Sequence, residues 1–162
     1  MDSQVELLKI CIGIENAISE TYGYLADRFP EERAFWKALA EEEKTHARKF
    51  VVSSSLKGAA GLPSSLQLAQ DALAAVKKAR REIFENAGLR LEDAFEIAIS
   101  LEMTAVEDFF ARMQSGEADD EMKGFFGAFL LEGRQHAERL RRRLAGIRSA
   151  GRQSDRKRPR PT

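Results

Sequence analysis

The sequence predicts an all-α protein, folded as a four-helix bundle with a long crossover that contains an additional helix. The composition favours helix, because alanine, leucine and long charged side chains dominate and only four of the 162 residues are proline. Apolar residues recur at intervals of three and four in several long segments, which is the spacing of one helix face. The segments form two similar pairs, since Glu102 follows Glu15 by 87 residues and His136 follows His46 by 90. Two helix pairs joined by a long crossover make a four-helix bundle.

The first helix pair occupies the N-terminal third of the chain. Asp2 or Ser3 can cap a helix that is predicted to extend to about Phe29. Pro30 is followed by two glutamates, which is typical of a helix start, because proline fits the first turn and acids interact well with the positive end of the helix dipole. The second helix is therefore predicted from Pro30 to about Leu56.

The crossover and the second helix pair follow. The segment KGAAGLPSS breaks the helical pattern, and a further helix is predicted at Leu66–Glu85, ended by the sequence NAG. The third helix of the bundle is predicted at residues 91–113. Asp119 or Asp120 caps the last long helix, whose apolar stripe reaches Leu144. Residues 1–147 are therefore assigned to the bundle, and residues 148–162 to a basic, proline-containing tail that is predicted to be disordered.

The composition also limits the classes of function. Acidic and basic residues are equal in number, 26 each, so the net charge does not indicate a nucleic-acid or membrane partner. Cys11 is the only cysteine, which excludes an internal disulfide and a cysteine-rich metal site. No apolar run approaches the roughly 18 residues that cross a membrane, and the N-terminus lacks the layout of a signal peptide, so we expect a cytoplasmic protein. The basic tail could bind an acidic partner or nucleic acid through salt-dependent contacts, but a solvated tail is the simpler interpretation.

Five polar residues interrupt the predicted apolar stripes. Glu15, for example, lies seven residues after Leu8 and seven before Tyr22, on the face that should pack into the bundle. An unpaired carboxylate in such a core costs several kcal/mol, so another group must compensate for its charge. The five residues are Glu15, Glu43, His46, Glu102 and His136.

Together these residues are typical of a metal site. Glu43 and His46 are three residues apart, so they lie one turn apart on the same side of a helix and can bind the same metal centre. A glutamate from each of two helices plus Glu-x-x-His from each of the other two is the ligand set of carboxylate-bridged di-iron bundles. Carboxylate oxygen and imidazole nitrogen suit iron, manganese or zinc, with two ions per chain if the set is intact.

The second half of this set lacks one carboxylate. EEEKTH and LEGRQH, which contain the only two histidines, match at Glu42 and Glu132, but Gly133 stands opposite Glu43. Three explanations remain open. Glu132 could swing into the vacant space. The site could instead bind one metal ion, or two with water or an exogenous anion in the gap, or it could be degenerate, with His136 only hydrogen-bonded to a core glutamate in a structural bundle.

These residues carry a resemblance to a known family. The chain resembles the rubrerythrin group of the ferritin-like superfamily over both helix pairs, residues 3–50 and 91–144, and LAEEEKTHA is especially typical of the second helix of that family. The resemblance implies a di-iron centre that reacts with peroxide or dioxygen or oxidises ferrous iron, an electron donor still to be identified, and a homodimer. Within such a centre Glu43 would bridge or chelate, Glu15 and Glu102 would be terminal or bridging ligands, and each histidine would give one nitrogen.

The chain departs from that family in three places. One cysteine cannot build the rubredoxin-like four-cysteine iron site that would deliver electrons. Ala105 stands where rubrerythrin proper has a further acidic ligand, and Gly133 stands where the fourth helix has a glutamate. The alternative function is therefore a degenerate ferritin-like bundle with one or no metal ion, which acts in metal sensing or storage or as a structural dimer. Tyr22, on the same helix face as Glu15, could hydrogen-bond a ligand carboxylate.

Overall fold

A computed structural model of the chain describes residues 2–57, 66–103, 108–115 and 120–156. Within these ranges the chain is almost entirely helical and forms no β-strand. The elements are α1 (Asp2–Arg28), the short 3₁₀ helix η1 (Pro30–Glu32), α2 (Arg33–Lys57), α3 (Leu66–Glu85), α4 (Leu91–Ser100), α5 (Asp108–Ser115) and α6 (Asp120–Arg156). The all-α class that the sequence predicts is confirmed.

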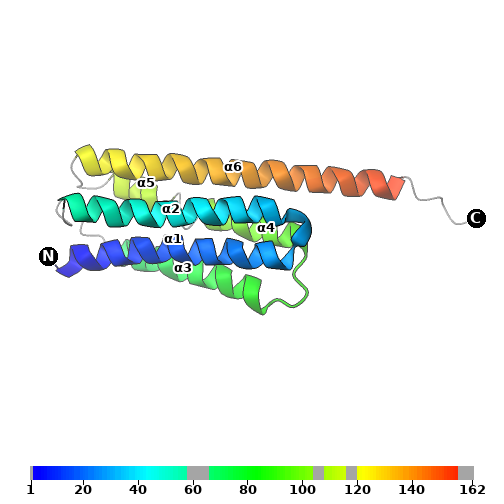
Figure 1. The fold of residues 1–162 in the computed structure, drawn as a ribbon, viewed down its shortest axis with the longest axis horizontal. Helices are drawn as coiled ribbons and strands as arrows, with labels where there is room; N and C mark the ends of the chain where they lie inside the picture. The colour runs from blue at the N-terminus through cyan, green and yellow to red at the C-terminus, as the bar shows by residue number, and fades with distance from the viewer. Residues whose placement is uncertain (1, 58–65, 104–107, 116–119, 157–162) are drawn as a thin grey trace, which may run out of the picture.

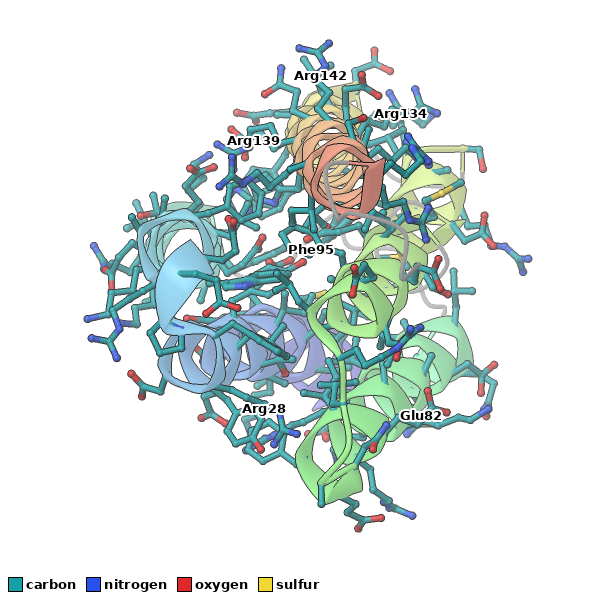
Figure 2. The ribbon with its side chains drawn as sticks, turned by 90° about the vertical axis from the view of Figure 1, so that its right-hand side faces the viewer. Arg28, Glu82, Phe95, Arg134, Arg139 and Arg142 are labelled. Carbon is teal, nitrogen blue, oxygen red and sulfur yellow. The ribbon has the colours of Figure 1, made fainter. Side chains whose placement is uncertain are left out.

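The bundle has four helical positions, one of which is shared by two consecutive helices, and α3 lies outside it. α1 and α2 form an antiparallel hairpin, α4 and α5 follow one another in the third position, and α6 occupies the fourth and is the longest (Figure 1). Seen along the bundle, α1, α2, α6 and α4 form the corners while α3 packs against α1 (Figure 2). Because α3 carries the chain back across the bundle, α4 and α5 run parallel to α2. This is the ferritin-like bundle with a helical crossover that the sequence predicts.

The turn between α1 and α2 is tied to α6. The backbone amide of Phe29 donates to the carbonyl of Leu25 at 2.9 Å, which closes α1, and Pro30 then begins η1. Glu32 is only 6% exposed and accepts two hydrogen bonds from the guanidinium of Arg143 on α6, at 2.7 and 2.6 Å. A paired, charge-assisted contact of this kind fixes the register between the hairpin and α6.

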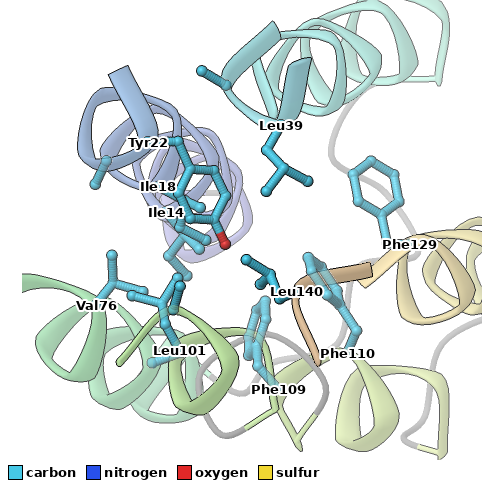
Figure 3. Close-up of a cluster of buried hydrophobic side chains, with 14 of the residues drawn as sticks. Ile14, Ile18, Tyr22, Leu39, Val76, Leu101, Phe109, Phe110, Phe129 and Leu140 are labelled. Carbon is cyan, nitrogen blue, oxygen red and sulfur yellow. The ribbon is translucent and has the colours of Figure 1, made fainter. Parts of the chain in front are cut away.

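Apolar layers lie on both sides of the polar residues of the core. Before them along α2, Trp36 packs on Tyr22 and Phe95, with ring centroids 5.7 and 4.5 Å apart. After them, Phe50 packs on Phe129 of α6, with centroids 4.4 Å apart. Figure 3 shows Tyr22 and Phe129 among the buried side chains that converge from several helices. These rings shield the centre of the bundle from solvent on two sides, so any charge buried there must be balanced within the protein.

The α-helix that begins at Leu91 ends at Ser100, which differs from the single α-helix predicted at residues 91–113. α4 ends at Ser100 and is followed by a π-helical turn that includes residues 101–103, and Glu102 lies within that turn. Residues 104–107, and with them Ala105, lie outside the described residues. A π turn adds a residue to one helical turn and is frequent at functional sites, because it displaces a side chain from its regular position.

The last helix extends further than the sequence pattern indicated. The apolar stripe of α6 ends near Ile147, and a disordered tail was expected from residue 148, whereas the structure continues α6 to Arg156. The segment between them, RSAGRQSDR, contains no proline, so an existing helix can continue through it without an apolar face. Residues 157–162 lie outside the described part. Among the described helices, none has the length and apolar character needed to cross a bilayer.

Candidate metal centre

The five polar residues predicted to face the core meet at one depth in the bundle. Each is at most 7% exposed, although each is charged or readily protonated. They come from different elements: Glu15 from α1, Glu43 and His46 from α2, Glu102 from the π turn, and His136 from α6. Helical periodicity places the four residues of α1, α2 and α6 on buried faces, since the apolar neighbours on each stripe set which face is buried, whereas Glu102 is positioned by the π turn.

One group of three potential ligands lies between α1 and α2. Nδ1 of His46 is 2.9 Å from Oε2 of Glu43 and 3.5 Å from Oε2 of Glu15. Each of the three residues offers one ligand atom, and these atoms all lie within 4.8 Å of one another. Two carboxylate oxygens and one imidazole nitrogen at this spacing form a donor set suited to a divalent transition metal.

A second group lies between α2, α6 and the π turn that follows α4, and it shares a residue with the first. Nδ1 of His136 is 2.6 Å from Oε1 of Glu43 and 3.6 Å from Oε1 of Glu102. The ligand atoms of these three residues again lie within 4.8 Å of one another. Glu43 thus turns one oxygen to each histidine. The rings of His46 and His136 are stacked with centroids 5.4 Å apart, so the two groups are neighbours.

Several polar atoms in the two groups lack hydrogen bonds, which tests whether a cation fits. Oε1 of Glu15, Oε1 of Glu43 and Nδ1 of His136 are buried without a hydrogen-bond partner, as is the unrelated Nε1 of Trp36. The Glu43 and His136 atoms are only 2.6 Å apart yet are not aligned for a hydrogen bond. Buried polar groups without partners are rare and destabilising. Cations held by the two groups would provide partners for these atoms, so the donor set fits bound metal ions.

The pKa values show how the buried charges balance one another in the protein without metal. Burial raises the pKa of Glu15 well above its usual value, and burial together with the charge of Glu43 raises that of Glu102. For Glu43, burial is outweighed by the effect of the two neighbouring imidazoles, and its pKa is lowered. For the histidines, burial opposes the charge, but the two neighbouring glutamates of each ring raise the pKa of His46 to about 10 and that of His136 to about 11. Protons thus occupy the places that metal ions would take.

Tyr22 contacts the site as the sequence suggested. Its hydroxyl donates a hydrogen bond to Oε1 of Glu102 at 2.5 Å. Burial and the charge of Glu102 raise the pKa of Tyr22 well above its ordinary value, so the phenol keeps its proton and remains a donor. In Figure 3 the hydroxyl of Tyr22 points away from α1 toward the middle of the bundle. This bond fixes the orientation of one candidate ligand.

Glu132, the sixth candidate ligand, lies outside both groups. Its Oε2 is 2.8 Å from Nε2 of His46, the ring nitrogen that faces away from the other carboxylates, and its oxygens accept hydrogen bonds from Lys49 at 2.7 and 2.8 Å. The side chain is 32% exposed. Gly133 is buried on α6, so no side chain of that residue reaches the centre.

Sequence reasoning did not assign a role to Glu42, which occupies the corresponding place at the other histidine. Its Oε2 is 2.9 Å from Nε2 of His136, and Arg139 donates two hydrogen bonds to it at 2.9 and 2.7 Å. The signal that could have found it is the repeated spacing of a glutamate four residues before each histidine. Cys11 is buried.

Comparison with known proteins gives the family. Searches of curated proteins and of solved structures found no significant match. The family model described as Rubrerythrin matches residues 6–144, a range that contains all five residues of the two groups and most of the chain. The 162 residues hold one cysteine and so contain no rubredoxin-type iron site. The chain belongs to the rubrerythrin family.

Proposed function

We propose that this chain is a non-haem di-iron carboxylate protein that reacts with peroxide or dioxygen or oxidises ferrous iron. The observation that carries the proposal is the pair of buried ligand groups that share Glu43 and contain polar atoms without hydrogen bonds. Membership of the rubrerythrin family also supports the proposal, because carboxylate–histidine bundles of this kind hold two metal ions. Manganese or zinc would suit the same donor atoms.

The residues divide between two ions. Glu15 and His46 would hold one ion, Glu102 and His136 the other, and the two oxygens of Glu43 would serve both. When bound, the irons would supply electron-transfer chemistry that no side chain of the chain can provide. The protein would contribute the preformed arrangement of ligands and a site from which bulk water is excluded.

The surroundings of the ligands support a reaction with a small molecule. Phe129 packs edge-on against His46, with centroids 5.3 Å apart, and closes one side of the site. Between α2 and α6 a groove of about 350 Å³ reaches both histidines and is lined by polar residues. Peroxide and dioxygen are small enough to approach along such a groove. Tyr22 would hold its proton on the hydroxyl oxygen and keep Glu102 oriented throughout.

The proposal extends to partners and location. No four-cysteine site is present in these residues, so the electrons would come from a separate donor. We further propose that the protein is a homodimer, as the family resemblance implied, and that it is located in the cytoplasm. A second candidate function is metal sensing or storage, or a structural role, with one or no metal ion. Gly133 favours it, because the fourth helix lacks the carboxylate that would complete the second half.

Metal stoichiometry separates the two functions. The protein is loaded with ferrous iron under anaerobic conditions, freed of loosely bound ions and analysed for iron per chain. Two irons per chain, followed by consumption of peroxide above the rate of free iron, is the result expected for the di-iron protein. One or no iron, or no consumption above that rate, would leave the sensing, storage or structural function.

A further inference from the structure

Two helices carry the same three-residue pattern around their histidines. In each, a glutamate lies four residues before the histidine and a basic residue lies three residues after it, giving Glu-x-x-x-His-x-x-Lys/Arg. On a helix these three residues share one side. The members are Glu42, His46 and Lys49 on α2, and Glu132, His136 and Arg139 on α6.

Each glutamate contacts the histidine of the opposite helix. Oε2 of Glu132 lies 2.8 Å from Nε2 of His46, and Oε2 of Glu42 lies 2.9 Å from Nε2 of His136. Both contacts are made to the ring nitrogen that faces away from the shared carboxylate of Glu43, because Nδ1 of each ring faces that carboxylate. The arrangement is therefore reciprocal between α2 and α6.

The basic residue of each helix binds the glutamate of the opposite helix. Lys49, on the same helix as His46, holds both oxygens of Glu132 at 2.7 and 2.8 Å. Arg139, on the helix of His136, holds both oxygens of Glu42 at 2.9 and 2.7 Å. Each glutamate is thus fixed by a histidine and a cation that stand one turn apart on the facing helix.

The chemistry of imidazole gives this arrangement a consequence. A neutral imidazole carries its hydrogen on one nitrogen and a lone pair on the other, and an acceptor beside one nitrogen places the hydrogen there. Once the Nδ1 proton is released on metal binding, a carboxylate at Nε2 would keep the remaining hydrogen on Nε2, so the lone pair of Nδ1 would be directed into the bundle. Such partners also fix the ring against rotation and make the ligating nitrogen more basic.

We propose that Glu42 and Glu132 are positioning residues that orient His136 and His46, respectively, for metal binding through Nδ1. The inference rests on the proposed metal centre and adds to it the residues that prepare both imidazoles. It also gives Glu132 a role other than replacing the carboxylate absent at Gly133. Lys49 and Arg139 act one step further out, by holding the two glutamates in place.

Zinc binding provides a test, because zinc is diamagnetic and suits the same ligands. Zinc affinity is measured by competition with a chelator for the native chain and for Glu132→Ala and Glu42→Ala. Removing a carboxylate partner of a ligating histidine lowers metal affinity about 10- to 100-fold. Glu41→Ala is the matched control, since Glu41 lines the same groove but pairs with Lys44 at 2.6 Å and touches neither histidine. The control should bind zinc as the native chain does.

The imidazole signals of His46 and His136 allow the two ligand groups to be observed separately. Nitrogen–proton spectra of the imidazoles in the zinc-loaded protein should show a protected Nε2 hydrogen on each ring. Glu132→Ala should speed solvent exchange of the His46 hydrogen alone, and Glu42→Ala that of His136 alone. Glu132→Gln keeps a neutral acceptor and much of the shape of the side chain, so its zinc affinity should lie between those of the native chain and Glu132→Ala. Because this variant is nearly isosteric, it controls for a folding defect in Glu132→Ala.

The outcomes distinguish the two proposals. If the native chain binds zinc and iron but both alanine variants match Glu41→Ala, the positioning role is overturned while the metal centre stands. The same conclusion follows if zinc is bound through Nε2, with the hydrogen on Nδ1. If the native chain binds neither zinc nor iron, the metal centre itself fails and the positioning role fails with it.

Discussion

Replacing Glu43 by alanine should affect both halves of the metal centre at once. The two oxygens of Glu43 lie 2.9 Å from Nδ1 of His46 and 2.6 Å from Nδ1 of His136, and the residue belongs to both ligand groups. Loss of a mere partner of a ligand costs about 10- to 100-fold in affinity. Loss of a shared ligand should therefore cost at least about 100-fold at each of the two positions, so that neither ion survives removal of loosely bound metal.

The same substitution should destabilise the metal-free protein. Glu43 is 2% exposed and is the carboxylate nearest to both imidazoles. Removing one member of a buried charged group costs about 3–5 kcal/mol, because the partners remain buried without compensation. Thermal unfolding of the native chain and the variant, both stripped of metal, measures this difference.

Single-group variants provide the matched comparison. Glu15 belongs only to the group of His46, so Glu15→Ala should weaken one ion and leave the other. Calorimetric titration with zinc counts the ions and gives their affinities. Full loading with two ions in Glu43→Ala would refute the assignment of this residue as a ligand. A loss of only one ion would refute its shared position.

Four further predictions concern other buried contacts of the bundle. Tyr22→Phe removes the hydrogen bond to Glu102 and should weaken metal binding in that half by roughly 10-fold, about 1.4 kcal/mol, in the same titration. Metal binding should release protons and weaken as the pH falls, because the two imidazoles have raised pKa values of about 10 and 11 and are protonated at neutral pH. Calorimetric titration in buffers of different ionisation enthalpy counts the released protons. In the metal-free protein their contribution to stability should be complete below pH 6.5, the ordinary histidine value, and lost as the pH rises through about 10 and 11. Arg143→Ala leaves the buried Glu32 without its partner and should lower the free energy of unfolding by about 1–3 kcal/mol, whereas Arg142→Ala, which breaks only an exposed pair, should change it by less than about 0.5 kcal/mol.

Apolar spacing was sufficient to predict most of the fold. The crossover helix at Leu66–Glu85 has the same bounds in the sequence prediction and in the structure. The π turn at Glu102 was not predicted, because the apolar residues on either side keep helical spacing and one additional residue in a turn leaves no sign in that pattern. The extension of α6 to Arg156 was missed for the opposite reason, since a helix that leaves the bundle has no apolar face to detect.

The candidate site was predictable in membership and less so in orientation. A polar residue at a position where helical spacing predicts an apolar one can be recognised from the sequence, and the five central residues were predicted on that basis. Which ring nitrogen of His46 faces inward depends on contacts from another helix, and no spacing within α2 contains that information. For the same reason the sequence left Glu132 as a potential ligand, because its contact with Lys49 joins residues 83 positions apart.

The position of Glu132 bears on the carboxylate that is absent at Gly133. To fill that gap, Glu132 would have to leave both the ammonium of Lys49 and Nε2 of His46. Both contacts are charge-assisted, and giving them up would strand a cation and an imidazole hydrogen without an acceptor. The structure therefore favours an explanation in which Glu132 stays outside and the gap is not filled by the chain itself.

A purely structural bundle would be expected to satisfy its own buried groups. In that case Nδ1 of His136 would hydrogen-bond a core carboxylate, but it lies 3.6 Å from Glu102 and is not aligned with Glu43 at 2.6 Å. The explanation that agrees with our proposal is a site that binds one metal ion, or two that share Glu43, with the side of Gly133 left to water or a small exogenous anion. An open coordination position is a cost to a storage or structural site and an advantage to a reactive one, since the substrate must reach the metal. In the proposed di-iron protein the missing carboxylate would supply that open position, whereas in the alternative function it would mark a reduced or lost site.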